Sequence, residues 1–89
     1  KTLGKETSLM PEQKIQSKKI KELEALGYYV IKLKLTNKNG IPDLIAIPKN
    51  SDVEFIEVKK PKGKLSKLQE YRIQELQKHG VKVEVYKGQ

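Results

Sequence analysis

Apolar residues recur every three to four positions in two parts of the chain, which predicts helices over residues 11–26 and 66–79. Proline is favoured at the first position of a helix and glycine directly after its end, so Pro11 and Gly27 should delimit the first helix. Gly80 should end the second helix in the same way. The apolar stripe of the first helix, which should face the core, comprises Ile15, Ile20, Leu23 and Leu26.

Runs of alternating or continuous apolar residues predict four strands, over residues 28–35, 43–47, 53–59 and 81–86. The second run, DLIAI, is almost entirely apolar and lies between two prolines, so we expect a central strand that is buried on both faces. Tyr29, Ile31, Leu33 and Leu35 of the first run should share one face, with Lys32 and Lys34 opposite, whereas Val81, Val83 and Val85 of the last run should point inward.

The predicted order is helix, three strands, helix, strand. Short loops join the first three strands, which should therefore pair as an antiparallel meander. The second helix is a crossover, so the last strand should lie parallel to a neighbour. We expect a single α/β domain over residues 11–89, with a mixed central sheet flanked by helices and a flexible N-terminal segment over residues 1–10.

Composition narrows the range of partners. The chain has 89 residues, enough for one small domain with a limited core, and pairing with a second copy would enlarge that core. Its net charge of +8 favours a polyanionic partner, either nucleic acid or an acidic membrane surface, although a solvated lysine-rich surface is the alternative. The absence of cysteine excludes disulfides and thiolate zinc sites and fits a reducing, intracellular setting. No apolar run is long enough to span a membrane.

Two polar residues break the apolar stripes of the helices. Glu12 lies in the middle of the stripe of the first helix, where the alternative role is a first-turn acid that the helix dipole favours. Gln69 lies on the apolar stripe of the second helix, and its alternative role is a capping box with Ser66. Both side chains are therefore expected to point at the sheet.

Three charged residues break the apolar pattern of the strands. Asp43 begins the central strand, although it could be an ordinary turn aspartate. Glu57 and Lys59 are two residues apart and share a face, where a structural salt bridge is the alternative. If Glu12 joins Asp43 and Glu57 at one end of the sheet, these three acids would repel one another without a cation. Oxygen ligands without His or Cys suit a hard ion, so we expect Mg²⁺ or Mn²⁺.

These residues form an ordered set of motifs: PEQKIQ in the first helix, then GIPD, FIEVKKPKGKLSKLQ and HGVKVEVYK. From residue 11 onward the chain resembles the VRR-NUC (virus-type replication-repair nuclease) family of the PD-(D/E)XK nuclease superfamily. Pro42 and Asp43 match the PD element, and residues 57–59 match the (D/E)XK element. The resemblance implies a PD-(D/E)XK nuclease core for the predicted α-β-β-β-α-β order.

The resemblance also implies roles for the site residues. Asp43 and Glu57 would be metal ligands, together with the backbone carbonyl of Val58 and with Glu12 from the first helix. Lys59 would position or activate the attacking water. Glu12 and Gln69 would complete the catalytic set with Asp43, Glu57 and Lys59. The DNA-binding residues would follow the third strand in a basic loop, at Lys60, Lys62, Gly63, Lys64 and Lys67, which is otherwise a solvated charged loop. Lys32, Lys34 and Lys38 would extend the same surface.

The function that follows is a metal-dependent, structure-selective DNA endonuclease that hydrolyses phosphodiester bonds. The chain has no helix-turn-helix or zinc-finger pattern, which favours recognition of branched or structured DNA by shape. A homodimer resembling a Holliday junction resolvase would supply two sites for a four-way junction. The alternatives are a flap or DNA-end nuclease of the same family, or a non-catalytic nucleic-acid-binding module. The expected location is intracellular and cytoplasmic, as for a bacterial or phage-type nuclease.

Overall fold

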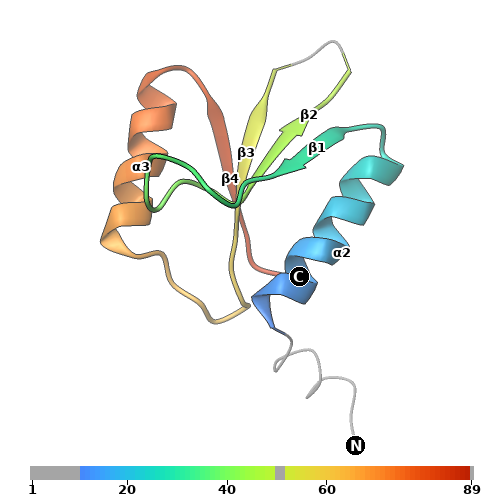
Figure 1. The fold of residues 1–89 in the computed structure, drawn as a ribbon, viewed down its shortest axis with the longest axis horizontal. Helices are drawn as coiled ribbons and strands as arrows, with labels where there is room; N and C mark the ends of the chain where they lie inside the picture. The colour runs from blue at the N-terminus through green and yellow to red at the C-terminus, as the bar shows by residue number, and fades with distance from the viewer. Residues whose placement is uncertain (1–10, 50–51, 89) are drawn as a thin grey trace, which may run out of the picture.

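The computed structural model describes residues 11–49 and 52–88 (Figure 1). The predicted order of elements is confirmed. The expected flexible segment over residues 1–10 lies outside the described residues. The helices and strands within the described ranges are α2 (Glu12–Ala25), β1 (Tyr29–Lys32), β2 (Leu44–Ile47), β3 (Glu54–Val58), α3 (Lys67–Lys78) and β4 (Lys82–Tyr86).

The four strands form one mixed sheet in the order β1-β2-β3-β4. β2 pairs antiparallel with both β1 and β3, whereas β4 pairs parallel with β3. This is the expected meander followed by a helical crossover, because a parallel neighbour cannot be reached through a short turn. α2 and α3 lie on opposite sides of the sheet (Figure 1).

The apolar core lies between the sheet and α2. Alternate strand residues point to this face, and Leu44, Ala46, Ile56 and Val58 are fully buried against Ile15 and Leu23 of the helix. Ile20, Tyr28, Val30 and Tyr86 pack around that cluster. A fully buried leucine or isoleucine side chain contributes about 1.5–3 kcal/mol relative to an exposed one. This face therefore supplies much of the stability of the fold.

The apolar face expected in the first strand is largely exposed. β1 ends at Lys32, Tyr29 is 70% exposed and Leu35 is 99% exposed, whereas Val30 packs on the core. The reason is the register, which pairs Val30 with Ala46 and so turns it towards α2. Alternation predicts the period of a strand but not which of two apolar sets is inward.

The ends of α2 and the exposure of β4 also differ from the predictions. Pro11 is the N-cap of α2 rather than its first residue, and Leu26 lies beyond the helix and is 76% exposed. Gly27 follows with a φ of 96°, the left-handed conformation expected of a glycine at a helix end. Val85 is more exposed than predicted because β4 forms an edge of the sheet.

Candidate active site

The antiparallel register brings the two strand acids together. Leu44 of β2 pairs with Ile56 of β3, so the next residues along, Asp43 and Glu57, are cross-strand neighbours on the α3 face. Asp43 is fixed on both sides. Its Oδ2 accepts a hydrogen bond from the backbone N–H of Val58 at 2.8 Å, and its carbonyl accepts one from the N–H of Leu33 at 2.8 Å.

Glu57 is a deeply buried acid with an unsatisfied oxygen. Its side chain is 1% exposed, and Oε1 has no hydrogen-bond partner among the described residues. Burial raises the pKa of Glu57 to about 8, and the neighbouring carboxyl group of Asp43 and the charge of Glu12 raise it further. The charge of Lys59 lowers this pKa. A buried acceptor without a partner is costly, so this oxygen is arranged to meet a cation or a proton.

Gln69 holds the other oxygen of Glu57. Its Nε2 donates to Glu57 Oε2 at 3.1 Å. At the same time Gln69 and Ser66 form a capping box, in which Ser66 Oγ accepts from the N–H of Gln69 and Gln69 Oε1 accepts from the N–H of Ser66. The two roles that the sequence left as alternatives therefore occur together. The cap fixes the amide group in the orientation that lets it donate to Glu57.

Lys59 and Glu12 act on Glu57 through their charge. Lys59 follows Glu57 by two residues, and its N–H donates to the carbonyl of Tyr86 at 2.8 Å. The structural salt bridge between Glu57 and Lys59 does not form, since within residues 11–49 and 52–88 the single ion pair joins Arg72 to Glu75. No group of three or more His, Cys, Asp and Glu side chains in these ranges is close enough to hold one ion. Glu12 thus remains a predicted ligand.

The basic loop leads from β3 to α3. Lys60, Lys62, Lys64 and Lys67 are all exposed, and none of them makes an ion pair within the described part of the chain. The N–H of Gly63 donates to the carbonyl of Lys60 at 2.9 Å, which closes a tight turn. A Cβ atom at Gly63 would lie 3.2 Å from that carbonyl oxygen, so glycine suits the turn. The four lysines therefore leave exposed positive charges without acidic partners on the loop that follows β3.

Comparison with known proteins agrees with this geometry. A sequence profile of the VRR-NUC domain matches residues 3–89. The chain belongs to the VRR-NUC family. A solved structure described as a VRR_NUC domain is 31% identical, with a TM-score of 0.78 over 86% of this chain and 84% of the other. No curated protein matches the chain significantly. The predicted family and its PD-(D/E)XK core are therefore confirmed.

VRR-NUC is a nuclease-type family whose members generally need a divalent metal, and the acids of this chain fit such an ion. The carboxylates of Asp43 and Glu57 offer only oxygen donors, which hard ions prefer. The unpartnered Oε1 of Glu57 is a free acceptor in a buried position. Mg²⁺ is usually bound by one or two protein carboxylates, and water and phosphate oxygens complete its coordination.

One polar residue of the VRR-NUC motifs received no role from the sequence. Gln16 lies one helical turn after Glu12, is 8% exposed, and its Oε1 has no partner among the described residues. Its place on the apolar stripe, four residues after Glu12, was the available signal. The helix that carries Glu12 therefore also carries a buried amide whose oxygen has no partner among the described residues.

Proposed function

We propose that the protein is a metal-dependent, structure-selective DNA endonuclease that hydrolyses phosphodiester bonds. The observation that carries this proposal is the buried Glu57, which has one free oxygen and lies beside Asp43 in a chain of a nuclease family. A buried acid of this kind reduces stability and therefore needs a functional reason.

Each residue of the site has a role in this reaction. Asp43, Glu57 and the carbonyl of Val58 would hold Mg²⁺ or Mn²⁺, and Glu12 would approach from α2. When bound, the ion supplies charge stabilisation for the phosphate oxygens and lowers the pKa of an attacking water. Gln69 keeps Glu57 in one orientation, and Lys59 positions the water and offsets the charge of the phosphate.

The basic loop would grip the DNA backbone. The exposed lysines at Lys60, Lys62, Lys64 and Lys67 are not paired with acids, so their charges remain available to phosphates. Contacts of this kind carry no sequence information and weaken steeply with salt. The backbone at Gly63 would allow the strand to approach closely.

Recognition of branched DNA and assembly as a homodimer are parts of the same proposal. The described residues hold two helices on opposite sides of a sheet, so they contain no helix-turn-helix that would read a sequence. A homodimer similar to a Holliday junction resolvase would place two sites on one junction. No helix in the described residues is long and apolar enough to cross a membrane. A cytoplasmic location is supported by the absence of cysteine.

The test is cleavage of labelled duplex, flap, splayed-arm and four-way junction DNA in Mg²⁺, Mn²⁺ or EDTA. We expect metal-dependent cutting that Lys59→Ala abolishes while DNA binding survives. Binding without cutting under every condition would replace the nuclease with a non-catalytic binding module. Preference for flaps or ends would identify the other nuclease classes, and light scattering at several concentrations would test the homodimer.

A further inference from the structure

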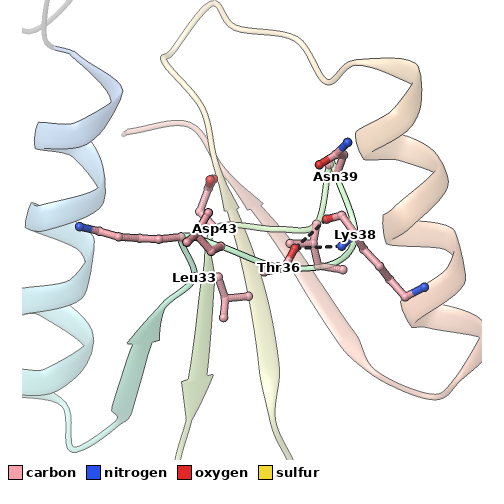
Figure 2. Close-up of a pocket in the computed structure, with 9 residues that line it drawn as sticks. Leu33, Thr36, Lys38, Asn39 and Asp43 are labelled. Atoms are coloured by element: carbon pink, nitrogen blue, oxygen red, sulfur yellow. Dashed lines mark hydrogen bonds between the residues drawn. The ribbon is translucent and has the colours of Figure 1, made fainter.

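A polar pocket adjoins Asp43 on the side of the loop between β1 and β2 (Figure 2). Its volume is about 240 Å³, whereas one water occupies roughly 30 Å³ in the liquid, so it has room for a larger group. Asp43 therefore borders both the candidate metal site and this pocket. Most of the lining comes from the loop itself, at Leu33, Lys34, Leu35, Thr36, Lys38, Asn39, Gly40 and Ile41.

The loop is closed at its ends and braced inside. The hydrogen bond from Leu33 to Asp43 joins its two ends. Thr36 Oγ1 donates to the carbonyl of Lys38 at 2.8 Å and accepts from the N–H of Lys38 at 3.2 Å. Such side-chain bonds to the nearby backbone fix a turn. Compact loops with adjacent ends are frequently functional.

α3 anchors the loop from outside. Arg72 Nε donates to the carbonyl of Asn39 at 2.9 Å. Gly40 has a φ of 81°, and a Cβ atom there would lie 2.8 Å from Cγ of Leu68, so the loop backbone packs directly on the helix. Arg72 lies one helical turn after Gln69, which holds Glu57. One helix therefore fixes both the pocket and the acid.

The chemistry of the pocket suits a nucleotide. Lys34 lines it and makes no hydrogen bond or ion pair among the described residues, so its charge is available to a phosphate. Lys38 extends towards α3 in Figure 2, where the hydrogen bond from Arg72 lowers the pKa of Glu75 and the charge of Lys38 adds to this effect. Thr36 and Asn39 add polar groups that can bond to a sugar or phosphate.

We propose that this pocket binds the sugar and phosphate of the nucleotide next to the scissile phosphate, with Lys34 as the phosphate contact and Arg72 and Gly40 as positioning residues. The inference rests on the proposed function, because Asp43 and Glu57 mark the point of cleavage. The pocket would be a second DNA contact besides the basic loop. It would determine which phosphate of the strand reaches Asp43 and Glu57.

The charge of Lys34 is tested against a matched lysine. Lys49 is exposed and follows the far end of β2, away from Asp43, so Lys49→Ala removes the same charge elsewhere. Binding of fluorescent duplex and junction DNA is measured in Ca²⁺ over a range of salt concentrations. We expect Lys34→Ala to weaken binding about tenfold at low salt and to lower the log–log salt slope by about 1 more than Lys49→Ala does.

The position of the loop is tested without changing any charge. Gly40→Ala places a Cβ atom against Leu68, whereas Gly80 has nearly the same φ, 80°, with nothing within 4 Å of the added atom. Both substitutions place a side chain on a residue with a left-handed φ, so the backbone strain is similar. We expect Gly40→Ala to weaken DNA binding several-fold more than Gly80→Ala, with the salt slope unchanged, while circular dichroism confirms that both variants fold.

A scan of the DNA identifies the phosphate. Single phosphates near the cut are replaced by neutral methylphosphonates, and wild-type affinity should fall most at the position that Lys34 contacts. The Lys34→Ala variant should lose no further affinity there. If Lys34→Ala matches Lys49→Ala and Gly40→Ala matches Gly80→Ala while the wild type still cuts DNA, this inference is wrong and the nuclease stands. A wild type that neither binds nor cuts DNA overturns both.

Discussion

The two faces of the sheet differ in what they bury. On the α2 face, Ile56 and Val58 are fully buried in an apolar core. On the α3 face, Glu57 between them is equally buried, but it bonds to an amide and lies next to a second acid. Successive residues of one strand point to opposite faces, so three consecutive positions serve stability and chemistry without competing for space. A protein this small can thus carry a destabilising site because the other face compensates for it.

Truncating the core should have the largest effect. Ile56→Ala removes a fully buried side chain from the α2 face and should lower the free energy of unfolding by about 2–5 kcal/mol. The measurement is urea unfolding followed by circular dichroism. Val85→Ala, at the exposed edge of the other face, is the control and should cost far less. Similar losses for both variants would remove the distinction between the faces.

Neutralising the buried acid should reduce cleavage and leave stability intact, the opposite of truncating the core. Glu57→Gln keeps the size of the side chain and removes its charge, so stability at pH 8 and above should be equal to or greater than that of the wild type. Cleavage should fall by about 100-fold or more, because even residues that only orient metal ligands contribute 10- to 100-fold. Rates and unfolding curves of one preparation provide the comparison. A stable variant with full activity would exclude Glu57 from the site.

The pH dependence of stability should also distinguish the faces. Because the pKa of Glu57 is about 8 in the folded protein and 4.5 in its reference state, the folded state binds more protons between these values. Stability in EDTA should therefore decrease as pH rises from 4.5 to 8, with a slope of at most about 1.4 kcal/mol per pH unit from this group. Below pH 4.5 the contribution is constant. Glu57→Gln should flatten the slope, while Ile56→Ala should leave it unchanged.

The smallest expected effects separate the two roles of Gln69. Ser66→Ala removes the acceptor for the N–H of Gln69 and should cost about 1 kcal/mol of stability. Gln69→Glu keeps a residue suited to the capping box but replaces the amide donor with an acid beside Glu57. Cleavage should then fall about tenfold with little loss of stability. Equal activity of Gln69→Glu and wild type would limit Gln69 to the helix cap.

Much of this arrangement could be predicted from the sequence. The order of elements followed from the hydrophobic periodicity and from the prolines and glycines at the ends of the elements. The proximity of Asp43 and Glu57 followed from their places on neighbouring strands. The inward face of β1 could not be predicted, since Tyr28 and Val30 are as apolar as Tyr29 and Ile31. Only pairing with β2 selects between these two sets.

The contacts within the site were harder to predict than the identity of its residues. That Gln69 caps its helix and holds Glu57 at once depends on a contact between residues 12 apart in sequence. The bond between Arg72 and Asn39 spans 33 residues and follows from no local pattern. The metal ligands and DNA contacts remain predictions that the variants above can test.

The hydrogen bond between Leu33 and Asp43 joins the two ends of the loop, so the position of Asp43 does not depend on the length of the loop. Because the ends are joined, lengthening the loop costs only a slowly growing closure entropy and need not move the carboxylate. Loops of other sizes, taken from relatives or designed, can therefore be exchanged between these two residues. The same catalytic scaffold would then accept a new choice of DNA.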